Sequence, residues 1–169
     1  MTDQAAIIRP FLADEWPLYR DLRLRALRDS PDAYGSILAL EASLSDVEWA
    51  ERLARGVHSA RELPLVAECE GEPCGIAWVR LGDDAPECAH LYQMWVAAEQ
   101  RRRRVGRALV DAAAEWARRL GAKQLDLDVT ANNDAAVRLY EGAGFVVHGE
   151  RRPLRPDSTL EAQAMRLEL

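Results

Sequence analysis

The stretch Gln100–Leu109, QRRRRVGRAL, joins an expected strand to an expected helix. The residues before it, Leu91–Val96, are apolar and aromatic, as is typical of a strand. The residues after it carry apolar side chains three and four positions apart, which is the spacing of an amphipathic helix packed on a sheet. These apolar residues are Val105, Ala108, Leu109, Ala112, Ala113, Trp116, Ala117 and Leu120. A strand, a turn and a helix are therefore expected at the centre of the fold.

The turn itself is strongly basic, because it contains the four consecutive arginines Arg101–Arg104. At the start of a helix, unpaired backbone N–H groups and the positive end of the helix dipole meet these guanidinium groups. Such a point binds an anionic phosphate. The same run is also typical of a solvated surface or of a nucleic-acid patch. The net charge of -6 and the position at a strand-to-helix junction favour the phosphate of a small molecule over nucleic acid.

The whole chain has 169 residues, of which 49% are apolar, and this predicts one domain over residues 1–169 with a single core. No apolar run approaches the roughly 18 residues of a membrane span, and the N-terminus lacks the pattern of a secretion signal. A cytoplasmic protein without a membrane segment is expected. The cysteines Cys69, Cys74 and Cys88 lack paired metal-ligand spacing, which predicts free thiols and no metal site. A Cys69–Cys74 disulfide is the alternative, since these two flank an expected turn.

The first part of the chain is expected to form a strand and two helices. The strand covers Ala5–Phe11, and Asp14 then caps a helix that Pro31 stops. A polar segment, Asp32–Leu44, separates it from a second helix that runs through Ala54. The inward-facing residues are expected to be Trp16, Tyr19, Leu22, Ala26 and Leu27 in the first helix and Val47, Ala50 and Leu53 in the second, whose capping box is Ser45 with Glu48.

The middle of the chain reads as three antiparallel strands. Leu65–Glu70 and Cys74–Leu81 are joined by the turn Glu70-Gly71-Glu72-Pro73. A second turn, Gly82–Pro86, leads to the strand that ends at Val96. These three strands would form the antiparallel half of a mixed sheet.

After the central helix, Gly121 is expected as its C-terminal cap. Gln124–Val129 alternates as a half-buried strand, with Leu125, Leu127 and Val129 on one face and Asp126 and Asp128 on the other. Asn133–Ala143 is expected as a helix, Phe145 begins another strand, and Ala162–Leu169 forms an edge or insertion strand. The predicted fold class is thus α/β, a single domain with a mixed, largely antiparallel sheet flanked by helices.

The run from Met94 to Phe145 resembles the acetyl-CoA-binding core of the GCN5-related N-acetyltransferase (GNAT) family. In that family a strand ending in Val leads to a loop of pattern Q/R-x-x-G-x-G/A that opens a helix, and here Val96 and the loop Arg101–Gly106 match. A second, more specific block follows about 25 residues later. It comprises Asn133, Ala136, Leu139-Tyr140 and Gly144-Phe145. The resemblance places the cofactor-binding core at about residues 89–147.

One position departs from the family pattern. With the register set by Gly106-Arg107-Ala108-Leu109, the first glycine of the loop is replaced by Arg104. Glycine permits positive φ and close approach of the backbone to a ligand. A side chain at 104 is therefore expected to require either a non-glycine backbone conformation or an orientation away from the pyrophosphate.

The resemblance implies a set of residues that bind coenzyme A. Backbone groups of Met94 and Val96 would pair with the pantetheine arm as if it were another strand, and Asn133 would contact the cofactor, cap a helix, or do both. The pyrophosphate would lie in the loop that begins at Arg101, on the amides of Arg102, Arg103, Arg104, Val105, Gly106 and Arg107. Charge-assisted bonds from fixed N–H donors at a helix start are short and strong, which is consistent with this placement.

The resemblance also implies catalytic residues. A Tyr at the position of Tyr140 protonates the leaving thiolate in the family, and a Glu near the start of the central strand accepts the amine proton through water. This chain has His90 at the matching position, with Glu87 three residues earlier. Histidine is a chemically suitable base near pH 7. The structural alternatives are a surface histidine and a core tyrosine.

The expected activity is transfer of an acetyl group from acetyl-CoA to a primary amine of a small molecule or peptide, by direct attack in a ternary complex. A non-catalytic acyl-CoA-binding module of the same fold is the alternative. A nucleic-acid-binding domain lacks support, since the arginines are not interleaved with aromatic residues. Segment Asp32–Ser36, the strand bearing Trp78 and the last strands would build the acceptor pocket, and the acidic total weakly favours a cationic acceptor. Dimers are common in the family, so the resemblance allows a homodimer, but the sequence does not determine the oligomeric state.

Overall fold

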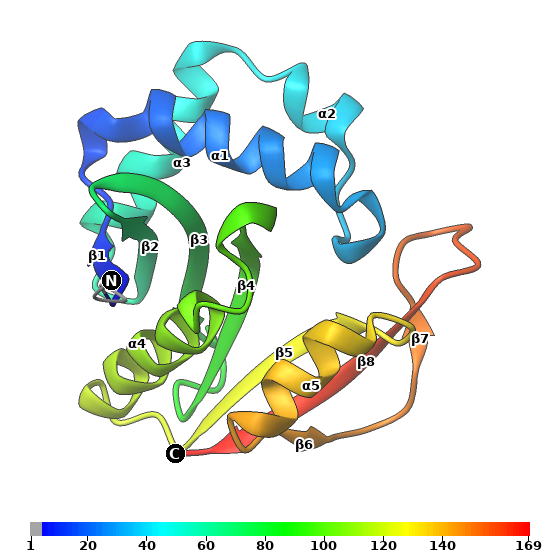
Figure 1. Cartoon of the computed structure of the whole chain (residues 1–169). Coiled ribbons are helices and arrows are strands. Elements are labelled where there is room, and N and C mark those ends of the chain that lie inside the picture. The colour runs from blue at the N-terminus through cyan, green and yellow to red at the C-terminus, as the bar shows by residue number, and fades with distance from the viewer. Residues whose placement is uncertain (1–4) are drawn as a thin grey trace.

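The computed structural model describes residues 5–169, and its centre is one mixed sheet with strand order β1-β2-β3-β4-β5-β8-β6, to which β7 adds by pairing with β8 (Figure 1). All neighbours are antiparallel except β4 and β5, which run parallel. The strands are β1 Ile7–Pro10, β2 Glu62–Cys69, β3 Glu72–Leu81, β4 Cys88–Val96, β5 Gln124–Thr130, β6 Val146–Val147, β7 Arg152–Pro153 and β8 Glu161–Glu168. The predicted α/β fold with a largely antiparallel sheet is confirmed.

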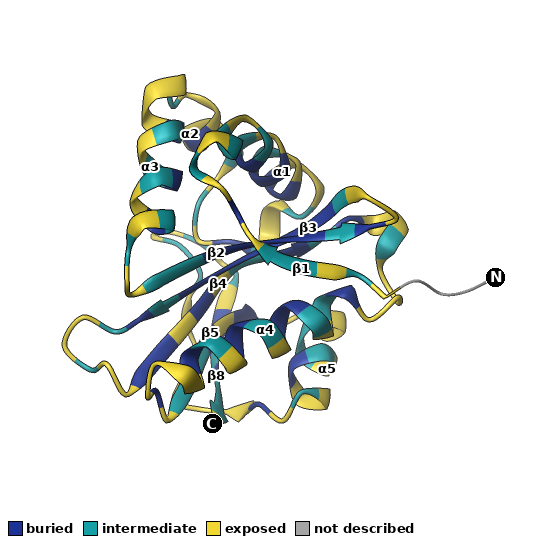
Figure 2. Ribbon diagram, turned by 90° about the vertical axis from the view of Figure 1, so that its left-hand side faces the viewer, coloured by how far each residue is buried: buried dark blue, intermediate teal, exposed yellow. Residues whose placement is uncertain are grey.

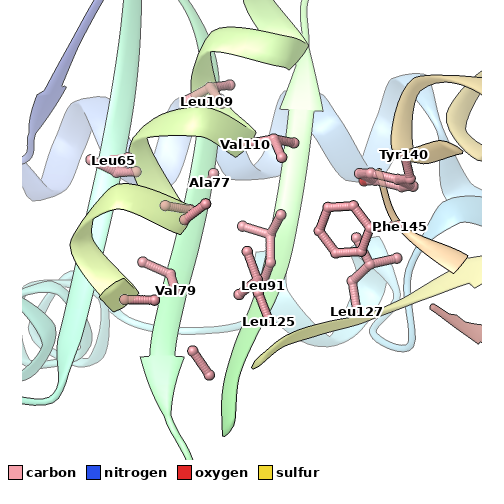
Figure 3. Close-up of a cluster of buried hydrophobic side chains, with 14 of the residues drawn as sticks. Leu65, Ala77, Val79, Leu91, Leu109, Val110, Leu125, Leu127, Tyr140 and Phe145 are labelled. Carbon is pink, nitrogen blue, oxygen red and sulfur yellow. The ribbon is translucent and has the colours of Figure 1, made fainter. Parts of the chain in front are cut away.

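Helices cover both faces of this sheet (Figure 2). The helices are α1 Trp16–Asp29, α2 Leu38–Ala42, α3 Asp46–His58, α4 Val105–Arg119 and α5 Asp134–Gly142, and short 3-10 turns span Ala13–Glu15, Pro31–Ala33 and Ala98–Gln100. Helices α1 and α3 pack against one face through a cluster that includes Tyr19, Trp49 and Trp78. Helices α4 and α5 pack against the other face through a cluster that includes Leu109 and Tyr140 (Figure 3). The sheet is therefore the middle layer of three.

Strands β4 and β5 separate soon after they begin. They pair only at Cys88–His90, which face Gln124–Asp126. Beyond this point the two strands diverge (Figure 1). On its other side β4 stays paired with β3, but the register shifts between Ile76 and Trp78, and Gln93 has a φ of 55°. This bulge bends β4 away from β5 and opens the sheet.

Several sequence predictions about the elements are confirmed. Ser45 and Glu48 form a reciprocal capping box at the start of α3. The turn after β2 has positive φ at Glu70 and Gly71, and Gly121 has a φ of 86° just after α4. The last strand, β8, is inserted between β5 and β6 rather than lying at the edge. All three cysteines are buried free thiols, so the disulfide alternative is wrong.

Other predictions about the N-terminal half were wrong. Asp14 is not the cap of α1, because it lies inside a 3-10 turn whose closing residue, Glu15, accepts a hydrogen bond from the Leu12 amide at 2.8 Å. Val47 is 65% exposed, and Trp49 instead fills the inner face of α3. That helix also continues past Ala54, to His58. The segment expected to be polar loop contains the short helix α2, which buries Glu41.

Candidate functional site

The main cavity has a volume of about 1070 Å³ and is lined by residues of β4 and β5 where they diverge, by α1 and α3, and by segment 33–36. Four of the predicted site residues line it: His90, Met94, Asn133 and Tyr140. The basic loop, Val96 and Glu87 are not part of this lining. The fold thus brings the predicted catalytic tyrosine and histidine to one cavity.

Within residues 5–169, no strand pairs with the edge of β4 that faces this opening beyond His90. Ala97 donates its N–H to the Cys74 carbonyl of β3 at 2.8 Å. Because backbone groups of successive residues in a strand alternate in direction, Met94 and Val96 point the other way. Their carbonyls accept side-chain hydrogen bonds, Met94 from the Tyr34 hydroxyl at 3.0 Å and Val96 from Arg101 Nε at 3.0 Å. This edge is therefore free of strand partners but reachable by polar groups.

The basic loop ends where α4 begins, as predicted. Arg104 is the N-cap of α4, with φ 60° and ψ 12°, and Arg102 has a φ of 69°. Both lie in the left-handed region that glycine favours. Of the two expected alternatives for Arg104, a non-glycine backbone conformation is therefore excluded, and a side chain that points away from the pyrophosphate stays a prediction. The backbone at Arg104 has the positive φ that glycine adopts without cost, and the arginine bears the conformational strain.

The arginine side chains of the loop divide into those that contact other residues, including Arg103 through Gln100 and Glu70, and those that do not. Arg101 is held by Asp29 of α1, and Arg107 donates to the Gly142 carbonyl of α5 at 2.8 Å and pairs with Asp111. By contrast, Arg102 and Arg104 make no side-chain hydrogen bond or ion pair within residues 5–169, and both are exposed. The first group anchors the loop, while the second is available to an anion.

Gly106 sits in the first turn of α4, where space is tight. A Cβ at this position would lie 3.0 Å from Leu139 Cδ2 and 3.4 Å from Met94 Cε. The absence of a side chain therefore lets the start of α4 approach both α5 and β4. This places the free N–H groups of α4 beside the unpaired edge of β4.

Tyr140 lies on α5, close to the opening between the strands. Asn133 caps this helix, since its Oδ1 accepts the Ala136 N–H at 3.2 Å. The Tyr140 ring is 7% exposed and packs edge-on against Phe145, with ring centroids 5.7 Å apart. Burial raises the pKa of its phenol, and the hydroxyl makes no hydrogen bond within the described chain. Tyr140 is thus both a core residue and an unused proton donor at the cavity.

His90 is exposed and lies on β4 at the last pair that this strand makes with β5. The ligand atoms of Cys88, His90 and Asp126 lie within 4.8 Å of one another, a grouping that the sequence spacing did not predict. However, Arg166 binds Asp126 through two hydrogen bonds of 2.7 and 2.8 Å. Burial and the neighbouring Asp126 raise the pKa of Cys88 to about 11. Two of the three groups are therefore unsuited to bind a metal at neutral pH.

Glu87 is exposed in the turn before β4. Its backbone carbonyl accepts hydrogen bonds from Lys123 N at 2.7 Å and from Gln124 N at 3.1 Å. It therefore joins the start of β4 to the start of β5. Of the two predicted proton acceptors, only His90 lines the cavity.

Residues near position 30 also contribute to the site, and sequence reasoning missed their individual roles. Besides Tyr34, whose hydroxyl reaches Met94, Thr130 Oγ1 donates to the Asp32 carbonyl at 2.6 Å. Arg155 donates to the Tyr34 carbonyl at 3.2 Å. These contacts tie the segment after α1 to β5 and to the loop before β8. No local pattern could identify them, because each joins residues about 60 to 120 positions apart.

Comparison with known proteins identifies the family. The chain belongs to the acetyltransferase (GNAT) family, whose model matches residues 18–145. Acetyltransferases of this family use acetyl-CoA, and the resemblance deduced from Met94–Phe145 is confirmed. Among the residues described, no helix is long and apolar enough to cross a membrane.

Individual relatives and solved structures are acetyltransferases of different lengths and names. The chain is 29% identical to the mycothiol acetyltransferase of Sanguibacter keddieii, over 80% of this chain and 47% of that protein. It therefore spans about half the length of this relative. A GNAT acetyltransferase from Streptococcus pneumoniae has the same fold, with a TM-score of 0.81 and 22% identity over 97% of this chain and 99% of that one. A Salmonella typhimurium structure with its cofactor acetyl-CoA gives a TM-score of 0.76 and 20% identity, covering 98% and 95% of the two chains.

Proposed function

We propose that this protein is an acetyl-CoA-dependent N-acetyltransferase that acetylates a primary amine of a small molecule or peptide by direct attack in a ternary complex. One observation carries this proposal. The start of α4 lies beside the unpaired edge of β4, and Tyr140 lines the cavity that opens where β4 and β5 diverge.

The cofactor would be held by backbone groups. Its pyrophosphate would accept N–H bonds from residues 102–107, and the exposed guanidinium groups of Arg102 and Arg104 would add charge. Its pantetheine amides would pair with the edge of β4 at Met94 and Val96. Both carbonyls there already accept one side-chain hydrogen bond. Since a carbonyl oxygen has two lone pairs, each can accept a second.

The residues of the cavity would handle the protons of the reaction. Acetyl-CoA supplies an acetyl thioester, and the free amine forms the new C–N bond while the C–S bond breaks. The amine therefore loses a proton and the thiolate gains one. His90 is the favoured acceptor of the amine proton because it lines the cavity, and Glu87 could act only through water. Tyr140 would donate to the thiolate, since burial keeps its phenol protonated at neutral pH.

The experiment is incubation of the protein with acetyl-CoA and a panel of amines, in which thiol release and the acetylated product are both measured. Thiol release that requires an amine and yields its N-acetyl derivative supports the proposal. Binding of acetyl-CoA without release for any amine or peptide would instead indicate a non-catalytic acyl-CoA-binding module. Failure to bind acetyl-CoA would contradict both functions.

A further inference from the structure

We infer that the acceptor amine also carries a carboxylate, which binds at the end of the cavity formed by α1 and α3, next to Arg23, Arg52 and Arg55. This inference rests on the proposed function, and it narrows the acceptor to amino acids and related amino carboxylates. The acidic composition of the chain favours a purely cationic acceptor, whereas this inference adds an anionic group to the acceptor. The local charge, rather than the total of -6, faces the acceptor.

A buried arginine lies at the centre of this end of the cavity. Arg23 is 3% exposed, and it donates to both oxygens of Glu41, at 2.9 and 3.0 Å. Glu41 is itself 6% exposed and also accepts a hydrogen bond from Arg52 at 3.2 Å. Two guanidinium groups thus share one carboxylate. The cluster carries a net charge of +1 as long as Glu41 is ionised.

Glu41 is ionised at neutral pH. Burial alone would raise the pKa of its carboxyl group, but the hydrogen bonds and the charge of Arg23 outweigh burial, and the net shift is downward. Guanidinium groups carry a permanent positive charge in proteins. The surplus positive charge is therefore permanent.

One nitrogen of the cluster has no partner. Arg23 Nη1 is buried and makes no hydrogen bond within the described chain. A buried charged donor without an acceptor is costly, and a ligand acceptor is one way to satisfy it. A ligand carboxylate in this end of the cavity would supply the missing acceptor, and the half-buried Arg52 lines the same cavity with its own donors.

The other carboxylates of the cavity already have basic partners. Asp126 is bound by Arg166, and Asp128 by Arg152. Glu62 accepts the Trp78 indole N–H at 2.9 Å and lies 3.9 Å from Arg80.

Arg55, by contrast, lines the cavity and has no ion-pair partner among residues 5–169. The excess positive charge of the cavity therefore lies on α1 and α3.

Tyr34 connects this region to the proposed acetyl-transfer point. Its ring centroid lies 4.8 Å from Cζ of Arg23, and its hydroxyl donates to the Met94 carbonyl at 3.0 Å. A single side chain thus spans from the arginine cluster to the edge of β4. An acceptor whose carboxylate lies at the cluster can direct its amine toward His90 and Tyr140.

The test compares matched acceptors that differ only in the carboxylate. These pairs are lysine with cadaverine, ornithine with putrescine, and phenylalanine with phenethylamine. For at least one pair, kcat/KM of the amino acid should exceed that of the amine by about 10-fold or more, which corresponds to about 1.4 kcal/mol. Equal values in all pairs, or a preference for the decarboxylated amines, would overturn the inference while leaving the proposed acetyltransferase intact. A preference only for phosphoethanolamine over ethanolamine would overturn the choice of a carboxylate.

Two variants locate the site. The side chain of Arg55 is exposed, so Arg55→Gln removes its charge without disturbing the core. The second variant, Arg23→Gln, leaves Glu41 paired with Arg52. Each should bring the ratio of the two kcat/KM values toward 1, mainly through KM of the amino acid. The control is Arg118→Gln, at the far end of α4, which should keep the wild-type ratio. If both cavity variants also keep that ratio, the carboxylate does not bind at this cluster. If no amine or amino acid is acetylated, the proposed function fails first, and this inference with it.

Discussion

Replacing Arg104 with glycine tests whether the left-handed backbone conformation at this position lowers the stability of the protein. Arg104 caps α4 in the left-handed region, at φ 60°. Because Cβ approaches the carbonyl oxygen there, a residue other than glycine is disfavoured by about 1–2 kcal/mol. Its side chain makes no hydrogen bond or ion pair within residues 5–169, so little else is lost in the variant.

The size of the effect follows from two opposing terms. Glycine relieves the strain but makes the unfolded chain more flexible, which costs about 0.4–1 kcal/mol. Arg104→Gly should therefore stabilise the protein by up to about 1.6 kcal/mol, and by about 0.8 kcal/mol at the midpoints of the two ranges. For a chain of this length that corresponds to a rise in Tm of about 1–4 °C. Affinity for coenzyme A should stay the same or increase, because the backbone amides keep their positions.

Arg103→Gly is the matched control, since Arg103 is not among the residues with positive φ. This variant makes the unfolded chain more flexible, and it loses the hydrogen bond to Gln100 at 3.0 Å and the ion pair with Glu70 at 3.7 Å, so Tm should fall. Differential scanning calorimetry measures both variants, and titration calorimetry measures coenzyme A binding. A fall in Tm for Arg104→Gly would refute the strain argument. Loss of binding in this variant would show that the Arg104 guanidinium is itself a required contact.

Three further predictions concern neighbouring parts of the site. Gly106→Glu should weaken acetyl-CoA binding at least about 10-fold, because a negative charge and a bulky side chain would enter the proposed phosphate site beside Leu139. If calorimetry shows unchanged affinity in the folded variant, the phosphate binds elsewhere. His90→Ala should shift or remove the rising limb of kcat/KM against pH, and an unaltered profile and rate would leave the proton to Glu87 or solvent. Burial raises the pKa of Asp126, but the hydrogen bonds from Arg166 outweigh burial and hold it below its usual value. Asp126→Asn should therefore cost about 1–2 kcal/mol of unfolding free energy at pH 7. The difference from wild type should shrink as pH falls below about 4 in denaturant titrations, and a constant difference would contradict the ion-pair explanation.

Local patterns predicted most of the sheet and its helices. The alternation around Leu125 and Leu127 and the spacing after Val105 each reflect one buried face, so they identify strand and helix directly. Val47 shows where this reasoning fails. Its spacing suits the inner face of α3, but Trp49 fills more of the space against Tyr19 and rotates Val47 into solvent.

The site could be predicted only where it depends on short-range order. Local sequence determines the backbone of the turn between Val96 and Val105 and of the block Asn133–Tyr140. The acceptor end does not, since Arg23, Glu41 and Arg52 come from three different helices. Their pairing follows from how α1, α2 and α3 pack on the sheet. Composition could not show it either, because a chain of net charge -6 forms a locally positive cavity end.

Tyr140→Phe is the most direct measurement of the proposed mechanism. The variant keeps the ring that packs 5.7 Å from Phe145 and deletes only the hydroxyl, so Tm and acetyl-CoA affinity should change little. Loss of the proton donor for the leaving thiolate should lower kcat by roughly 10- to 1000-fold, as is usual for a general acid. Steady-state kinetics with a saturating amine, together with a thermal melt, give both quantities on one sample. A kcat within about twofold of wild type, with or without a lower Tm, would show that Tyr140 is a packing residue and that another group protonates the thiolate.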